Sequence, residues 1–232
     1  MDYVDGEILA FDKPYGWTSF DVVGKARWLI CRHLGIKKLK VGHAGTLDPL
    51  ATGVVVVCTG RKTKLIDSLQ SGRKEYIATL ALGATTPSFD LEKPIDRTYP
   101  TEHITLELIK EVIPRFKGEQ WQVPPEFSAV KVNGKRAYDL ARKGETVELK
   151  PKLLCIDEIE ILYFEPKNMC LILRIVCSKG TYIRALARDI GEALDSGAHL
   201  TALRRTKVGN ITLEDCITFE QLEDMLNNDT KI

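Results

Sequence analysis

The sequence lacks the features of a membrane protein, a secreted protein or a metalloprotein. Its longest apolar run, residues 53–58, is far shorter than the roughly 20 residues of a membrane-spanning helix and is typical of a buried strand. The first residues include Asp2, Asp5 and Glu7, where a signal peptide would carry Lys or Arg. None of the six cysteines forms a Cys-x-x-Cys pair, and the four histidines show no metal-ligand spacing with them. We therefore expect a cytoplasmic protein with reduced thiols, no membrane segment and no metal.

Net charge is also nearly absent, because 33 basic residues face 32 acidic ones. An RNA-binding protein often has a high pI, so the total charge does not favour one. Contact with phosphate depends on the local field rather than on the total. Basic residues gather in four short clusters, which are also common as solvated faces: Arg61, Lys62 and Lys64; Arg73 and Lys74; Lys131, Lys135 and Arg136; Arg204, Arg205 and Lys207.

The pattern of apolar residues predicts an α+β fold. Strands are expected at 6–11, 54–58, 74–82, 127–132, 153–164, 170–177 and 199–209. Helices are expected after an N-cap at Thr18 or Ser19, near 64–69, after Thr105 up to Pro114, at 181–194 and at 218–227. Strict βαβ alternation is missing, which favours a mixed or antiparallel sheet over a doubly wound parallel one. No repeat or linker divides the chain, so we expect one domain over 1–232, with 210–232 as a short helical tail.

Asp48 is the first candidate for chemistry. It lies in a glycine-rich loop, 35–52, and a loop of this length in a compact domain is usually functional or mobile. Pro49 restricts Asp48 to an extended backbone, and the buried strand that follows would hold the carboxylate at the mouth of a rigid sheet. The alternative is an Asx-turn, in which the side chain only caps its own loop. The loop by itself favours the Asx-turn.

Residues 42–53, Gly-His-Ala-Gly-Thr-Leu-Asp-Pro-Leu-Ala-Thr-Gly, resemble the hallmark motif of the TruB family of tRNA pseudouridine synthases. Other stretches resemble the family's motifs in the same order, from about residue 6 to residue 210: 9–19 with Lys-Pro-x-Gly-x-Thr-Ser, 74–76 with Lys-x-Tyr, 125–131, 178–184 and 197–205. The resemblance implies the pseudouridine-synthase catalytic fold, a central mixed, mostly antiparallel sheet flanked by helices.

The resemblance also implies a reaction. The family isomerises uridine 55 in the TΨC loop of tRNA by detaching the uracil, turning it and rejoining it through carbon. This chemistry is redox-neutral and needs no cofactor. The base must be extruded into a pocket, which costs a few kcal/mol. The implied partner is the TΨC stem-loop, with no protein partner, and we expect a monomer.

Three residues would carry the chemistry by family position. Asp48 would act as nucleophile or as base, and the sequence leaves both open. Tyr182 would lie by the flipped base and relay the proton at carbon five. Arg184 would pair with Asp48 and favour its ionised form. The alternative for residues 182–184 is an ordinary helical first turn with the arginine in solvent.

Four further residues would bind the substrate. Tyr76 matches the stacking tyrosine, for which about 1–3 kcal/mol per base is typical, although an ordinary strand aromatic is the alternative. His43 would pack among the loop bases or make a loop hydrogen bond. Leu203 would contact the base or serve as a core leucine. Lys131 would touch phosphate. Lys13 and Pro14 would mainly support the catalytic loop.

The chain departs from the family pattern in two places. Where the family carries Thr-Asp-Thr-x-Asp-x-x-Gly, residues 86–93 keep Thr86 and Asp90 but place Pro87 and Lys93 at the first Asp and the Gly. The chain as given also ends without room for a PUA domain, so RNA affinity is expected from the catalytic domain alone or with help from the last helix.

Three other functions compete with this interpretation. A guide-RNA-dependent synthase is disfavoured because that branch relies on a PUA domain. A non-catalytic tRNA-binding or folding factor is disfavoured because a binder has no need of a carboxylate that repels phosphate. A generic phosphate-binding α/β enzyme has no glycine-rich fingerprint to support it.

Overall fold

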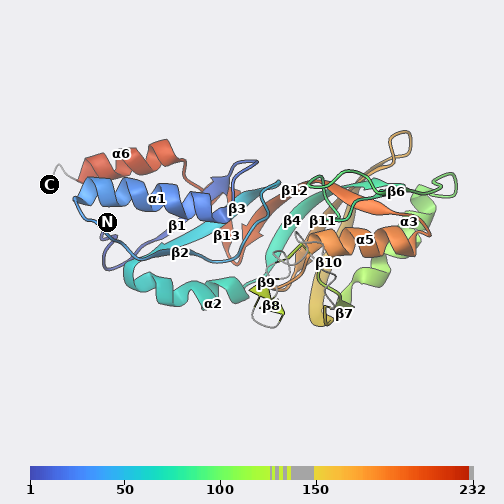
Figure 1. The fold of residues 1–232 in the computed structure, drawn as a ribbon, viewed down its shortest axis with the longest axis horizontal. Helices are drawn as coiled ribbons and strands as arrows, with labels where there is room; N and C mark the ends of the chain where they lie inside the picture. The colour runs from blue at the N-terminus through green and yellow to red at the C-terminus, as the bar shows by residue number, and fades with distance from the viewer. Residues whose placement is uncertain (126, 129–130, 133–134, 137–148, 230–232) are drawn as a thin grey trace. The chain divides into compact units, whose positions relative to one another are not determined.

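The computed structural model describes residues 1–125, 127–128, 131–132, 135–136 and 149–229 (Figure 1). By internal contacts the chain divides into two compact units. Unit 1 consists of Met1–Glu75 and Arg204–Ile232, and unit 2 consists of Tyr76–Leu203. The expectation of a single domain over 1–232 with a tail at 210–232 stays a prediction.

Unit 1 is built around β3, the strand that contains the long apolar run. β3 pairs antiparallel with β1 and with β2, and β13 pairs antiparallel with the end of β12. Val54 to Val57 are fully buried, so both faces of β3 are covered and the strand forms the core of the unit. The bounds of these strands are β1 Ile8–Lys13, β2 Val41–His43, β3 Ala51–Thr59, β12 Ala198–Val208 and β13 Ile211–Thr212.

The principal helix of unit 1, α1, spans Ser19–Leu34 and begins at the predicted cap. The Thr18 side chain accepts from the Asp21 N–H at 3.1 Å, and the Asp21 carboxylate accepts from the Thr18 N–H at 2.7 Å, which is a capping box. The buried apolar residues of α1 are Val22, Val23, Ala26, Leu29 and Ile30. The other helical elements of the unit are η1 Gly60–Leu65, α2 Ile66–Ser71, η3 Leu213–Asp215 and α6 Phe219–Asp229.

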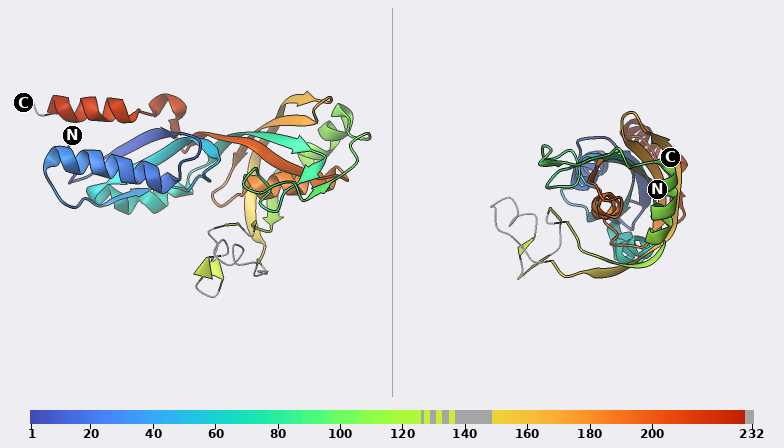
Figure 2. Two further views of the ribbon diagram at one scale, coloured as in Figure 1. Left: turned by 45° about the horizontal axis from the view of Figure 1, so that its top comes forward. Right: turned by 90° about the vertical axis from the view of Figure 1, so that its right-hand side faces the viewer.

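Helix α6 runs beside α1 (Figures 1 and 2). The Phe219 ring stacks on Phe11 with a centroid distance of 4.9 Å and on Trp17 at 5.7 Å. Arg32 of α1 donates to Glu223 of α6 at 2.9 Å. The last helix is therefore attached to the unit by aromatic stacking and one ion pair.

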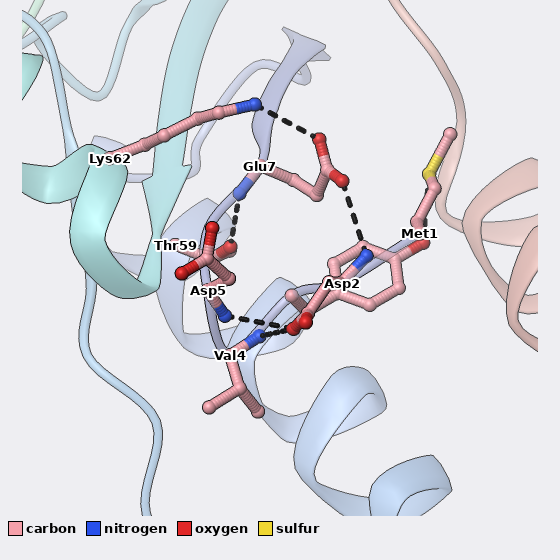
Figure 3. Close-up of polar contacts among 8 residues, drawn as sticks. Met1, Asp2, Val4, Asp5, Glu7, Thr59 and Lys62 are labelled. Carbon is pink, nitrogen blue, oxygen red and sulfur yellow. Dashed lines mark hydrogen bonds and ion pairs between the residues drawn. The ribbon is translucent and has the colours of Figure 1, made fainter.

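The acidic N-terminus has a structural role in unit 1 (Figure 3). Glu7 donates its N–H to Thr59 Oγ1 at 2.8 Å, and its carboxylate pairs with Lys62 at 3.3 Å. Asp2 Oδ1 accepts from the N–H groups of Val4 and Asp5. These contacts attach the first turn of the chain to the end of β3.

Unit 2 is an antiparallel assembly of long strands. β10 pairs antiparallel with β7 on one side and with β11 on the other. The order along the sheet is β1-β3-β12-β4-β11-β10-β7, and both β4 and β12 run from one unit into the other. Buried and partly exposed residues alternate along β4 and β11, as strands with one face on a core do. The bounds are β4 Lys74–Leu82, β7 Gly118–Gln122, β10 Lys152–Glu165 and β11 Cys170–Cys177.

The remaining elements of unit 2 are short, apart from α5, which leads out of the loop after β11. None of the helices formed by the described residues is both long and apolar enough to cross a bilayer. The bounds are β5 Ala84–Thr85, β6 Arg97–Thr98, α3 Leu106–Val112, η2 Ile113–Phe116, β8 Lys131–Val132, β9 Lys135–Arg136 and α5 Ile183–Ala193.

The predicted fold class, a mixed sheet flanked by helices, is confirmed, but several local predictions were wrong. β7 was missed, and the loop 35–52 contains β2. Residues 84–104 contain the β5–β6 pair. Pro114 does not end the helical segment, because it lies in the first turn of η2. Of the strand predicted at 127–132, residues 127–128 form a bend and 131–132 form β8, while the rest and the turn pair 133–134 lie outside the described residues.

Candidate active site

Asp48 lies in unit 1, on the loop between β2 and β3, and is half-buried. The loop starts where the Ala44 N–H donates to Val56 O at 2.8 Å. It ends where the Ala51 N–H donates to the carbonyl of Asp48 itself at 3.0 Å. Leu47, just before the carboxylate, is buried in the core. The main chain of Asp48 is thus anchored to the start of the central strand.

Ser19, the first residue of α1, holds the loop next to Asp48. Its hydroxyl accepts from the Leu47 N–H at 2.8 Å and donates to Leu47 O at 3.3 Å. Ser19 is buried, and it follows the capping residue Thr18 directly. The cap that starts α1 therefore also sets the position of a hydroxyl against the loop.

Lys13, the last residue of β1, supports the loop from its other side. Its side chain is fully buried, and Nζ donates to the carbonyls of Trp17 at 2.6 Å, Pro14 at 3.1 Å and Pro49 at 3.2 Å. An ammonium has three donors, and all three are used. The acceptor on Pro49 lies one residue after Asp48. These contacts agree with the expected supporting role of Lys13.

Arg205 of β12 is a second buried cation, with 1% of its surface exposed. Its guanidinium donates from Nη2 to Gly45 O at 3.0 Å, from Nη1 to Thr46 O at 3.4 Å and from Nε to Val54 O at 2.8 Å. Gly53, with φ +106°, lets the main chains approach, because a Cβ there would lie 2.1 Å from the Arg205 carbonyl oxygen. Arg205 thus joins the Asp48 loop to the central strand.

The buried cations shape the electrostatics of unit 1. The pKa of Lys13 is lowered from 10.5 to about 8, mainly by burial; the charge of Arg205 contributes to this shift, and the negative charges of Asp48 and Asp21 oppose it. Burial also lowers the pKa of His43, helped by the charge of Arg205 and opposed by the backbone of Gly45. The His43 ring is therefore neutral at pH 7, which suits packing against a base better than pairing with phosphate.

In unit 2, Arg184 is buried, with 5% of its surface exposed, and lies in the first turn of α5. It donates to Phe127 O at 2.8 Å and to Ser88 O at 3.2 Å, and Nε lies 3.7 Å from Asp90 Oδ2. The alternative of an arginine in solvent is therefore wrong. Asp48 belongs to unit 1, and its pairing with Arg184 stays a prediction.

The segment in which the sequence departs from the family pattern supplies Asp90. The carbonyl of Asp90 accepts from the hydroxyls of Thr86 at 2.7 Å and of Ser88 at 3.4 Å, and its carboxylate caps the Glu92 N–H at 3.0 Å. Thr86, Ser88 and Asp90 are all buried. The two residues that match the pattern, Thr86 and Asp90, therefore hold the segment that contacts Arg184.

Tyr182 occupies the N-cap position of α5, in unit 2. Gln122, at the end of β7, clamps its main chain: the Tyr182 N–H donates to Oε1 at 2.9 Å, and Nε2 donates to the Tyr182 carbonyl at 3.1 Å. The Tyr182 side chain is half-buried. The missed strand β7 thus has a direct part in setting the start of α5.

The other predicted substrate-binding residues are placed as follows. Tyr76, in β4, has 8% of its surface exposed, and Leu203, in β12, is half-buried, and both belong to unit 2. His43 ends β2 in unit 1. Lys131 lies in β8, paired with Arg136, and its side chain lies outside the described part. The roles assigned to these four residues stay predictions.

Sequence reasoning missed Ser19, Arg205 and Asp90 as site residues. Arg205 was counted within a basic surface cluster, yet Arg204 and Arg205 are neighbours on a strand, where successive side chains point to opposite faces. One of the two therefore had to face inward. Ser19 could have been found only as part of the helix start, because its partner on the loop is 28 residues away in sequence.

Comparison with known proteins places the chain among the pseudouridylate synthases. The model of the TruB family pseudouridylate synthase N-terminal domain matches residues 32–183, and that of the tRNA pseudouridylate synthase B C-terminal domain matches residues 184–231. Two similar relatives, both named tRNA pseudouridine synthase B, come from Phocaeicola vulgatus and Mycobacterium bovis. The first is 66% identical over 98% of this chain and 96% of its own length. The second is 44% identical over 94% of this chain and 72% of its own length.

Solved structures agree with this family assignment. A Cbf5-Nop10-Gar1 complex contains a chain with a TM-score of 0.72 and 30% identity, matched over 99% of this chain and 56% of that chain. An archaeal Nop10-Cbf5 complex contains a chain with a TM-score of 0.68 and 28% identity. The match covers 99% of this chain and 56% of that chain. The chain described here belongs to the TruB family of pseudouridylate synthases.

Proposed function

We propose that this protein isomerises uridine 55 in the TΨC loop of tRNA to pseudouridine, with Asp48 as the catalytic carboxylate on a flipped-out base. The observation that carries the proposal is the fixation of the Asp48 loop. Side chains from β1, α1 and β12 hold main-chain groups at residues 45, 46, 47 and 49, so the backbone on both sides of the carboxylate is fixed. A reacting group held in this manner needs little reorganisation in the transition state.

The roles of the other residues follow from family position and agree with their surroundings. Arg184, already desolvated beside Asp90, is the cation proposed to meet Asp48. Tyr76 stacks on the extruded base and Tyr182 relays a proton. The neutral His43 ring and Leu203 pack against bases, and Lys131 contacts phosphate. The proposed enzyme needs no cofactor, acts in the cytoplasm and works as a monomer.

A guide-dependent synthase is the second candidate, because the solved structures above include an H/ACA RNP bound to a substrate RNA, with a TM-score of 0.68. The relatives named tRNA pseudouridine synthase B are more similar, at 62–66% identity over nearly their whole length, and support the tRNA substrate. The two candidates differ in whether the protein needs a second RNA.

Incubation of the protein alone with an unmodified tRNA transcript, followed by chemical mapping of pseudouridine, distinguishes them. We expect pseudouridine at position 55, and none in a transcript that carries cytidine there. A product that forms only after a guide RNA is added would favour the second candidate. Tight tRNA binding without any product would favour the non-catalytic binding factor.

Asp48→Asn tests the catalytic role within the same assay. The amide is nearly isosteric but is neither a nucleophile nor a useful base, so we expect the single-turnover rate to fall by at least about 100-fold with tRNA affinity retained. Asp67→Asn is the matched control, because Asp67 is an exposed carboxylate in α2 of the same unit. Turnover by Asp48→Asn at the wild-type rate would remove Asp48 from the mechanism.

A further inference from the structure

The main chain around Asp48 is held by side chains at every residue from 45 to 49 except Asp48 itself. Arg205 holds the carbonyls of residues 45 and 46, Ser19 holds both main-chain groups of residue 47, and Lys13 holds the carbonyl of residue 49. The Asp48 carbonyl is held by the Ala51 N–H. The main chain on both sides of the Asp48 carboxylate is therefore held in place by these contacts.

The burial of the Arg205 charge in the interior of unit 1 is energetically unfavourable. Removal of a charge from water carries a penalty of several kcal/mol, and well-packed apolar residues of similar volume are often at least as stabilising. In the part of the chain that the structure describes, Lys13 donates to the carbonyls of residues 14, 17 and 49, and Arg205 donates to those of residues 45, 46 and 54. All the hydrogen bonds of both cations go to main-chain carbonyls. Stability of the fold alone does not account for such a residue.

The geometry of a guanidinium does account for a buried arginine at this position. Its planar fork presents donors in fixed directions, so one group can bond two successive loop carbonyls and a third carbonyl on β3. Rotation or shift of the loop would break at least one of these bonds and leave a buried donor unpaired, which costs about 1–3 kcal/mol. A lysine has donors but no fixed fork, so it would hold the charge without the same directional constraint.

The neighbouring Arg204 shows what an ordinary arginine does on the same strand. Its side chain is 42% exposed and pairs with Asp12 at 2.6 Å and with Thr52 at 3.3 Å. Among the described residues its contacts are with Asp12 and Thr52 and not with the loop at 45–49, although it carries the same charge one residue away. Arg204 therefore carries a positive charge next to Arg205 without holding the loop, whereas Arg205 holds it.

From these observations we infer that Arg205 is a positioning residue for the reaction: it fixes the carboxylate of Asp48 by bonding the carbonyls of Gly45 and Thr46 to the central strand. The inference rests on the proposed catalytic role of Asp48. Arg205 does not touch the substrate in this scheme, so its loss should change the rate of the chemical step and leave tRNA affinity largely unaltered.

Arg205→Lys and Arg205→Met test the inference, with Arg204→Met as the matched control. The measurements are the single-turnover rate at saturating tRNA, the Kd for tRNA, the unfolding midpoint, and amide hydrogen exchange of the segment 43–52. A displacement near 1 Å costs about 100-fold in rate, so we expect a loss of that order in Arg205→Lys with Kd nearly unchanged. Exchange of the segment 43–52 should accelerate in both Arg205 variants and stay at the wild-type level in Arg204→Met.

Several outcomes would overturn the inference. A folded Arg205→Lys protein with the wild-type single-turnover rate would do so, as would unchanged exchange of the segment 43–52. A loss that lies wholly in Kd would make Arg205 an RNA-binding residue instead. If Arg205→Met does not fold, Arg205→Lys alone decides. Should the wild-type protein form no pseudouridine, the proposed function fails, while hydrogen exchange still decides whether Arg205 fixes the loop.

Discussion

Single buried cations in the two units show how buried charge is used in this protein. Arg184 meets a carboxylate, that of Asp90, as well as two carbonyls, whereas among the described residues the hydrogen bonds of Lys13 and Arg205 go to carbonyls. A carbonyl dipole compensates a cation less completely than a carboxylate does, which agrees with the lowered pKa of Lys13. Lys13 and Arg205 therefore hold the loop at a cost in stability, and this cost is measurable for Lys13 because its charge titrates.

The first prediction concerns the pH dependence of stability. The pKa of Lys13 is about 8 in the folded protein against 10.5 in the unfolded chain. Between these values the unfolded chain keeps a proton that the folded protein has released, so the contribution of Lys13 to the free energy of unfolding rises with pH. The cost of the buried charge is fully present below pH 8 and is relieved above it. We expect a relative gain on the order of 2 kcal/mol between pH 7 and pH 10.

Urea unfolding of the wild-type protein and of Lys13→Met at pH 7, 8.5 and 10 measures this effect. The difference between the two proteins should move in favour of the wild type as the pH rises. The single-turnover rate of the wild type should fall as the pH rises. A neutral amine has two hydrogens for three carbonyls, so one contact with the loop is lost. A stability difference that does not vary with pH would contradict the assigned environment of Lys13.

At the scale of elements, sequence patterns predicted those strands and helices whose signals are local. β4 and β11 alternate between buried and exposed residues, and β3 is a continuous apolar run, so each carries its own signature. β7 was missed because its sequence, Gly-Glu-Gln-Trp-Gln, has no apolar periodicity and its position depends on pairing with β10, some 30 residues further on. The candidate site divides in the same way. The Asp48 motif is local, whereas the contacts of Arg205 with residues 45–54 span about 150 residues of sequence.

The second prediction concerns the start of α1. Thr18 caps the helix, and the next residue, Ser19, holds Leu47. Thr18→Ala removes the cap acceptor and should lower the free energy of unfolding by about 1 kcal/mol. It should also slow single-turnover isomerisation modestly, because fraying of the first turn releases the Ser19 hydroxyl from the loop. Thr18→Ser keeps the hydroxyl and is the control. Loss of stability with an unaltered rate would show that the cap and the loop are not coupled.

At the scale of the whole molecule, the small net charge conceals an uneven distribution. The stretch 210–232 carries one basic residue, Lys231, against six acidic ones: Glu214, Asp215, Glu220, Glu223, Asp224 and Asp229. The rest of the chain is correspondingly basic. A segment of this charge repels phosphate, so it is poorly suited to grip RNA. The stacking of Phe219 on Phe11 and Trp17 gives α6 a packing role in unit 1 instead.

The third prediction separates these two roles of the C-terminal segment. Glu214 and Asp224 are exposed, and the double variant Glu214→Gln/Asp224→Asn removes two negative charges while leaving the Arg32–Glu223 pair in place. If the segment does not hold RNA, removal of these two charges should leave the Kd for tRNA unchanged or lower it slightly. At low salt we expect a gain of at most about 0.6 kcal/mol in binding free energy, since only weak long-range repulsion is relieved. Phe219→Ala should instead lower the free energy of unfolding through lost aromatic packing. Weaker tRNA binding by the double variant, measured at two salt concentrations, would mean that the acidic segment does contact the RNA through these side chains.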